Sequence, residues 1–189
     1  MPPKPWKLVS SERKASFRIF DLRIDRACSP RTERIYDFYI LETTAWVNVI
    51  PLTPRNEVVL IRQYRHGTQE VTLEIPGGIV ESNDSPEVAA RRELLEETGY
   101  EASEMAPLGF VHPNPAFLNN RCYTFLAKDA RKVGKQAQDE KEDIEVVLRP
   151  VSHVPHLIRK GEITHALVLA AFYRFYMEHL ALCHNSKFL

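Results

Sequence analysis

Residues 78–100 read GIVESNDSPEVAARRELLEETGY, and the fold of the chain is decided by this stretch. It predicts a helix from about residue 85 to residue 98, with signals at both ends. The helix would have a capping side chain, a proline in its first turn, an acid that complements its dipole and a terminating glycine. These residues are Asp84 or Ser85 as the cap, Pro86, Glu87 and Gly99.

Three glutamates of this helix share one side. At about 100° per residue, Glu93, Glu96 and Glu97 fall within roughly 100° of one another. Ala89 and Ala90 lie near them, so this side is rich in carboxylates but sterically low. The opposite side is expected to face a core, because it carries Val88, Leu94 and Leu95.

The acidic side has two interpretations, a solvated surface and a metal site. Same-face carboxylates destabilise an isolated helix by a few tenths of a kcal/mol per pair, which weighs against a mere solvated surface. The preceding turn, Pro76-Gly77-Gly78, lets backbone carbonyls approach a ligand closely. Several carboxylates and a carbonyl are the hard oxygen ligands that Mg²⁺ or Mn²⁺ requires. Arg92 lies one turn before Glu96 and can hold that carboxylate in place.

The same segment resembles the Nudix box, in which a glycine is followed at set distances by an acidic residue, Arg-Glu, a Glu-Glu pair and a closing glycine. One position departs from the pattern, because Asp84 stands where the family has a glutamate that starts the helix and pairs with arginine. The matching residues are Gly78, Arg92, Glu93, Leu94, Glu96, Glu97, Gly99 and Tyr100.

Features outside the box resemble the ADP-ribose pyrophosphatase branch of this family. They are VVLIRQYR at 58–65, LEIPGG at 73–78, Pro115 downstream of the box, and DEKEDI at 139–144. The resemblance implies an α/β/α sandwich and a homodimer formed through an N-terminal sheet that is exchanged between subunits.

The pattern of strands and helices agrees with such a fold. Residues 17–25 and 34–41 are expected to form a hairpin, and residues 46–52 and 58–64 a second pair through a turn at 53–56. Mixed strands with a few outer helices indicate an α+β fold. Further strands are predicted at 73–75, 108–112, 122–127 and 144–148, and helices at 152–160 and 162–184, separated by Gly161.

The predicted architecture is therefore a Nudix-type α/β/α sandwich of mixed sheets with an N-terminal antiparallel accessory sheet. We divide the chain into N-terminal strands at 1–43, expected to form the dimer, and a Nudix catalytic domain at 44–189.

The resemblance also implies roles for the acidic residues. Glu93 and Glu97 would be the principal metal ligands, with Glu96 and the carbonyl of Gly77 completing the set. A general base must lie within hydrogen-bond reach of the attacking water. Glu140 is the first candidate and Glu142 the second, although an acidic run of this kind is also typical of an ordinary solvated loop.

Several residues are candidates for contacting the substrate. A guanidinium binds two phosphate oxygens in a fork, so Arg65 is a candidate phosphate ligand, and its alternative is a salt bridge to Glu74. Glu74 would orient Arg65 or contribute to the site. The remaining candidates are Asn119 and Arg121 for sugar hydroxyls, and Trp46 and Tyr36 for stacking on a base or else for packing. His153, His156 and His165 form no ligand set and are interpreted as ordinary helix residues.

Composition excludes some partners. Lysine plus arginine number 25, as do aspartate plus glutamate, so nothing indicates nucleic acid or a membrane surface as a partner. Cys28, Cys122 and Cys183 have neither metal-ligand nor disulfide-framework spacing, which favours a reducing cytoplasm. The start is polar, without a signal-peptide pattern. The most apolar stretch, near residues 163–183, is interrupted by charged residues and predicts an amphipathic helix.

Three functions follow as hypotheses. The first is Mg²⁺-dependent hydrolysis of ADP-ribose to AMP and ribose 5-phosphate, and the second is the same chemistry on a GDP- or UDP-sugar. The third is a catalytically silent nucleotide sensor, which predicts loss of the box carboxylates, yet Glu93, Glu96 and Glu97 are all present.

Overall fold

The computed structural model describes residues 2–138 and 143–179. The chain consists of two compact units, Met1–Thr44 with His112–Arg121, and Ala45–Val111 with Cys122–Leu189. None of the described helices is long and apolar enough to cross a membrane.

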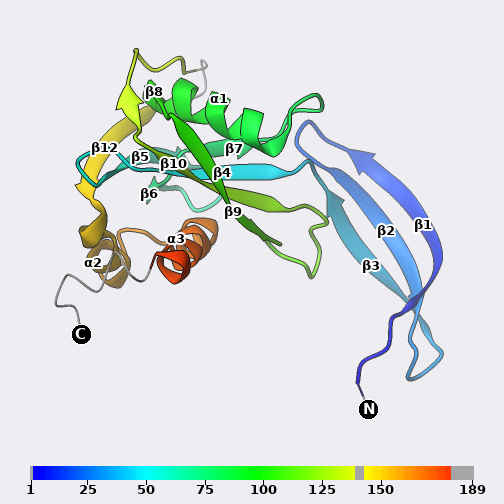
Figure 1. The fold of residues 1–189 in the computed structure, drawn as a ribbon. Helices are drawn as coiled ribbons and strands as arrows, with labels where there is room; N and C mark the ends of the chain where they lie inside the picture. Colours follow the sequence, from blue (N-terminus) through cyan, green and yellow to red (C-terminus); the bar gives the residue numbers. More distant parts are fainter. Residues whose placement is uncertain (1, 139–142, 180–189) are drawn as a thin grey trace. The chain divides into compact units, whose positions relative to one another are not determined.

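The first unit is built on a three-stranded antiparallel sheet in the order β1-β2-β3 (Figure 1). Its strands are β1 (Lys7–Ser16), β2 (Asp21–Cys28) and β3 (Ile35–Glu42). The hairpin of β2 and β3 was predicted, but β1 was not. Nearly every residue of β1 is exposed, so its sequence has no need for alternating apolar residues. Without that alternation, the sequence carries no strand signal.

The second unit contains a four-stranded sheet and a three-stranded sheet (Figure 1). One has the order β7-β4-β10-β9 and the other β12-β5-β6, and β10 runs parallel to β4. The strands are β4 (Trp46–Pro51), β5 (Glu57–Arg65), β6 (Glu70–Glu74), β7 (Gly77–Ile79), β9 (Glu104–Val111), β10 (Cys122–Lys128) and β12 (Ile144–Pro150). A two-stranded sheet joins β8 (Tyr100–Glu101) and β11 (Arg131–Lys132).

The predicted pairing of residues 46–52 with 58–64 is wrong. β4 and β5 lie in different sheets, and an isolated antiparallel bridge joins Leu52 to Val58 at the turn between them. Each strand has a run of consecutive buried residues, at positions 47–51 of β4 and 58–61 of β5, so both faces of each strand are covered there. Such strands are typical of a sheet covered on both sides, and they pair with partners distant in sequence.

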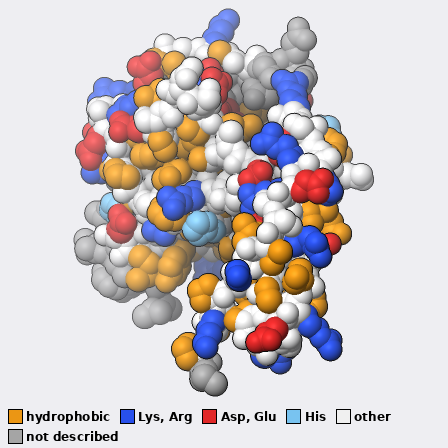
Figure 2. All heavy atoms as spheres, turned by 90° about the vertical axis from the view of Figure 1, so that its right-hand side faces the viewer, with side chains coloured by type: hydrophobic (Ala, Val, Ile, Leu, Met, Phe, Trp, Pro, Cys, Tyr) orange, Lys and Arg blue, Asp and Glu red, His pale blue; other side chains and the backbone are white. Residues whose placement is uncertain are grey.

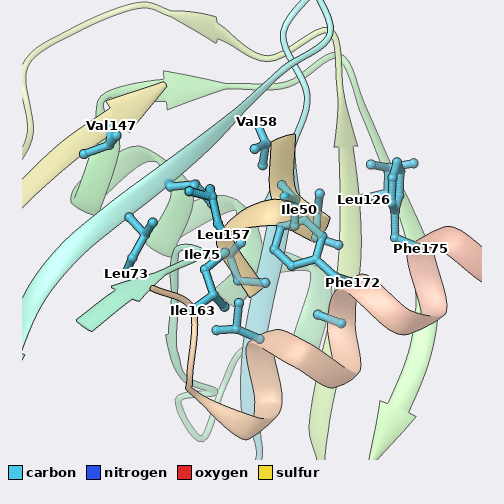
Figure 3. Close-up of a cluster of buried hydrophobic side chains, with 14 of the residues drawn as sticks. Ile50, Val58, Leu73, Ile75, Leu126, Val147, Leu157, Ile163, Phe172 and Phe175 are labelled. Carbon is cyan, nitrogen blue, oxygen red and sulfur yellow. The ribbon is translucent and has the colours of Figure 1, made fainter. Parts of the chain in front are cut away.

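Helices cover the sheets of this unit on two sides, which confirms the predicted sandwich (Figure 1). Helix α1 (Pro86–Thr98) packs on one side, while α2 (Val154–Arg159), preceded by a 3₁₀ turn at Val151–His153, and α3 (Ala166–Glu178) pack on the other. Phe172 and Phe175 of α3 belong to the same buried cluster as Ile50 and Leu126 of the sheet (Figure 3).

Helix α1 begins and ends as predicted. The side chain of Ser85 accepts a hydrogen bond from the Val88 amide, and Gly99 ends the helix at φ +72°. Its buried face differs from the prediction, because Val88 and Leu95 are 51% and 36% exposed. The buried residues of the helix are Ala89, Ala90, Leu94, Glu97 and Thr98. Small alanines therefore let the helix approach the sheet on the side that carries Glu97.

Candidate active site

Arg92 organises the exposed end of the acidic helix face. Its Nη1 donates to Glu93 Oε1 at 2.9 Å and to Glu96 Oε2 at 3.1 Å. Its Nε lies 3.5 Å from Asp84 Oδ2, and its Nη2 donates to the Ile79 carbonyl at 3.0 Å. The predicted links of Arg92 to Glu96 and of Asp84 to an arginine are both present. Burial acts to lower the pKa of Arg92, but Glu93 and Glu96 outweigh it and raise that pKa, so the arginine stays charged.

Glu97 joins the helix to the glycine turn. This side chain is buried, and its Oε2 accepts a hydrogen bond from the Gly77 amide at 2.8 Å. Both glycines of the turn have close neighbours. A Cβ on Gly77 would collide with the backbone of Val47, and a Cβ on Gly78 would collide with the carboxylate of Glu93. The backbone of β7 and the acids of α1 are therefore in direct contact.

The donor chemistry of this region suits a hard divalent cation. Three carboxylates, Glu93, Glu96 and Glu97, lie on one helix, and Glu97 contacts the backbone of Gly77. In the part of the chain that the structure describes, no three His, Cys, Asp or Glu side chains are grouped closely enough to hold a metal ion together. Glu93 and Glu96 instead contact Arg92, and Glu97 contacts Gly77, so a cation would compete with these partners for the carboxylates.

A cavity of about 310 Å³ lies in the same unit. Strands β4, β5, β6 and β10, the glycine turn that forms β7, and the start of α3 supply its walls. Its lining residues are Trp46, Val47, Asn48, Arg65, Glu74, Ile75, Gly77, Gly78, Ile79, Cys122, His165, Leu167 and Val168. Burial raises the pKa of the Cys122 thiol to about 12, so this cysteine is no nucleophile at neutral pH.

Arg65 and Glu74 form a two-bond ion pair in the cavity wall. Arg65 Nε and Nη2 donate to the two Glu74 oxygens at 2.8 and 2.7 Å, so the salt bridge to Glu74 is present. Glu74 is 2% exposed and also accepts from the Thr72 hydroxyl at 2.6 Å, whereas the Arg65 side chain is 41% exposed. Burial acts to raise the pKa of Glu74, but Arg65 and Thr72 outweigh it and lower that pKa. Glu74 therefore remains ionised and fixes the guanidinium.

His165 was interpreted as an ordinary helix residue, and this is wrong. It precedes α3 and lines the cavity, with Nδ1 3.8 Å from Glu74 Oε2. Burial lowers the pKa of His165, with Glu74 acting against the shift and Arg65 adding to it. No local pattern predicts this contact, because Glu74 and His165 are far apart in the sequence. His153 and His156 are exposed.

The remaining predicted substrate residues are divided between the two units. Trp46, at the start of β4, lines the cavity. Asn119 and Arg121 belong to the first unit, where Asn119 Oδ1 accepts from the Thr43 amide at 3.2 Å and so braces its own loop. Tyr36, also in the first unit, packs edge-on against Trp6.

The candidate bases Glu140 and Glu142 lie outside the described residues. The segment that precedes them is attached to the end of α1, because the Gln136 side chain and the Ala137 amide donate to the carbonyls of Glu97 and Glu96 at 2.7 and 2.8 Å. No sequence motif points to Gln136.

The chain is similar to several proteins of known name. It is 31% identical over 142 residues to the methanol dehydrogenase activator of Bacillus methanolicus, covering 75% of this chain and 76% of the relative. It is 26% identical over 158 residues to the ADP-ribose pyrophosphatase of Bacillus subtilis (83% and 85%). It is 33% identical over 134 residues to a GDP-mannose pyrophosphatase of Escherichia coli (67% and 70%).

Comparison with solved structures supports the same fold. An ADP compounds hydrolase superposes with a TM-score of 0.84 at 20% identity, over 96% of this chain and 98% of that one. The NUDIX domain family matches residues 43–172, which include α1, the glycine turn and the cavity. The chain is therefore a member of the NUDIX domain family.

Proposed function

We propose that the protein is a divalent-metal-dependent pyrophosphohydrolase that converts ADP-ribose and water to AMP and ribose 5-phosphate. The observation that carries this proposal is the contact of the acidic helix with the glycine turn through Glu97 and Gly77. It places a set of hard oxygen donors next to a cavity that contains Arg65. The relative named ADP-ribose pyrophosphatase supports the choice of substrate.

Hydrolysis of a diphosphate requires charge neutralisation on two phosphoryl groups and an aligned water. Glu93, Glu96, Glu97 and the Gly77 carbonyl are the proposed ligands of Mg²⁺, with Mn²⁺ as an alternative. A bound divalent cation neutralises phosphate charge and lowers the pKa of water. Arg92 holds Glu93 and Glu96 side by side before the cation binds.

Arg65 is the proposed phosphate ligand. Its ion pair with Glu74 uses Nε and Nη2, so Nη1 is available for a phosphate oxygen. Because Glu74 is buried and doubly bonded, it holds the guanidinium in one orientation before substrate arrives. Glu74 is thus a positioning residue for Arg65.

The base that deprotonates the water is proposed to be Glu140, with Glu142 as the alternative. The supporting observation is indirect. Gln136 and Ala137, which come shortly before these residues, are hydrogen-bonded to the last turn of α1.

A GDP-sugar is the second candidate substrate, because a similar relative is named GDP-mannose pyrophosphatase. The chemistry at the diphosphate would be identical. A panel of ADP-ribose, ADP-mannose, GDP-mannose and UDP-glucose with Mg²⁺, with products identified by mass, tests both candidates. We expect AMP and ribose 5-phosphate as the fastest-formed products. Faster release of GMP from GDP-mannose would favour the second candidate, and failure on every member would refute the proposal.

We also propose a homodimer that uses the sheet of the first unit. This sheet and its flanks expose large apolar side chains: Trp6, Leu8, Val9, Ile35, Tyr36, Phe38 and Tyr39. Figure 2 shows apolar side chains reaching the surface among charges of both signs on one face. Exposed apolar patches of this kind mark interfaces. Light scattering tests the dimer, and a monomer at micromolar concentration would refute it.

The cytoplasm is the proposed compartment, where Cys28 and Cys122 would stay free thiols.

A further inference from the structure

Two polar side chains of the cavity have no part in the mechanism above. Asn48 lies on β4 and His165 precedes α3, and both line the cavity. Asn48 Oδ1 and His165 Nδ1 are buried without a hydrogen-bond partner. The described residues contain four such side-chain atoms, so two of the four belong to the walls of one cavity. Native proteins rarely leave buried polar atoms unpaired without a reason.

The unpaired atom of Asn48 is an acceptor. Its Nδ2 donates to the Leu167 carbonyl at 3.3 Å. Because a carbonyl can only accept, the nitrogen of the amide must face Leu167, and the oxygen is left to take a proton from another group. Oδ1 therefore selects a ligand that carries O–H or N–H.

His165 can both donate and accept a hydrogen bond. Nδ1 lies 3.8 Å from Glu74 Oε2, which is too long for a hydrogen bond. Burial lowers the pKa of His165, so its ring is neutral at pH 7 and one nitrogen donates while the other accepts.

A sugar fits these groups better than a base does. Hydroxyls both donate and accept, which matches an acceptor in Asn48, a donor in Arg65 and a neutral imidazole in His165. About 310 Å³ is at the lower end of ligand pockets and holds one sugar ring, not a whole nucleotide sugar. Trp46 is the one aromatic ring other than His165 among the lining residues, so a base would not be sandwiched between two rings.

We propose that the cavity binds the sugar attached to the far phosphate, and that Asn48 and His165 determine specificity by binding its hydroxyls. This inference rests on the proposed function, because it assigns the half of the substrate that differs between ADP-ribose and other ADP-sugars. The diphosphate would then lie across Arg65 and the glycine turn, both of which line the cavity.

The test compares two diphosphates that share the same reacting bond. They are ADP-ribose and ADP methyl ester, which lacks the sugar. His165→Ala and Asn48→Ser should each reduce kcat/KM for ADP-ribose about ten-fold, mainly through KM, and change it less than about two-fold for the methyl ester. His165→Asn should recover part of the loss, since its amide also donates and accepts. His156→Ala is the matched control, because His156 is exposed on α2.

The outcomes separate the alternatives. Equal losses on both diphosphates would overturn the sugar assignment, because the effect would then be on the reacting bond or the fold. A loss on ADP-ribose that disappears with GDP-ribose would place the base in the cavity and would also overturn it.

If the wild type splits neither diphosphate, the proposed function fails but the cavity can still be tested. Ribose 5-phosphate binding, measured by ligand-detected NMR, should weaken about ten-fold in His165→Ala. Binding that is absent in the wild type, or unchanged in the variant, would overturn the inference.

Discussion

Two polar regions of the second unit, the acidic face of α1 and the wall of the cavity, are built in different ways. On α1, Glu93, Glu96 and Arg92 come from one helical turn, so their proximity is a local consequence of helix geometry. In the cavity wall, Arg65, Glu74 and His165 come from β5, β6 and the residue before α3. In the first region Arg92 contacts three part-exposed acids, whereas in the second Arg65 pairs with a single buried acid.

This difference indicates that the two regions have different roles. Acids held by a shared, part-exposed arginine can exchange that partner for a cation at modest cost. A buried carboxylate with two arginine bonds and a hydroxyl bond cannot change partners without leaving a charge unpaired. The helix face is therefore suited to binding and releasing metal, and the cavity wall to holding one fixed geometry.

The largest effect should arise at the proposed base, which belongs to neither region. Glu140→Gln is expected to reduce kcat by about 10²–10⁴-fold, because the water loses its proton acceptor. Glu142→Gln serves as the matched variant and should retain most of the activity. Steady-state kinetics with saturating Mg²⁺ measures both. The reverse ranking would transfer the role to Glu142.

In the cavity wall, replacing Arg65 alone should destabilise the fold more than replacing both members of the Arg65–Glu74 ion pair. Arg65→Met leaves Glu74 buried and unpaired, and should cost about 2–3 kcal/mol of unfolding free energy, moderated because Arg65 is partly exposed. The double variant Arg65→Met, Glu74→Leu should recover more than half of this loss. Urea unfolding of the three proteins gives the comparison. If the double variant is less stable than Arg65→Met, the pair is not the source of the effect.

Acid should weaken the cavity wall in two steps. The pKa of His165 is lowered on folding, so its contribution to stability is complete above its ordinary value of 6.5 and is lost as pH falls below that value. The pKa of Glu74 is also lowered, so its contribution is lost below its ordinary value of 4.5. Unfolding free energy measured from pH 8 to pH 4 should fall less between pH 7 and 5 in His165→Gln than in the wild type. Parallel curves in that interval would contradict the assignment to His165.

The smallest effect is expected on the outer side of α1. Val88 is 51% exposed, so Val88→Thr should change unfolding free energy by less than about 0.5 kcal/mol. Thermal unfolding at one protein concentration measures this. A loss above about 1 kcal/mol would show that Val88 packs against a surface absent from the isolated chain.

The features that could be predicted from the sequence are those that depend on residues close together along the chain. The limits of α1 follow from Ser85 and Gly99, and the Arg92–Glu96 contact follows from helical spacing. The partner of β5 did not follow, because a strand buried on both faces carries no signal for its neighbours.

The cavity was only partly predictable, because it is formed by residues that are far apart in the sequence. The Arg65–Glu74 pair was one of two alternatives, but the positions of Asn48 and His165 depend on tertiary packing of β4 and α3. The assumption that the apolar side of α1 faces the core failed at Leu95, since Ala89 and Ala90 let the other side approach more closely.

Divalent cation binding by the acidic face of α1 is the property on which the proposed activity depends most. The direct measurement is Mn²⁺ binding, followed by electron paramagnetic resonance, in the wild type and in Glu97→Gln, with Glu87→Gln as an exposed control on the same helix. We expect the wild type and the control to bind alike, and Glu97→Gln to bind at least about ten-fold more weakly, with kcat reduced at least ~10²-fold and the fold retained. Equal Mn²⁺ affinity and near-normal turnover in Glu97→Gln would contradict the account.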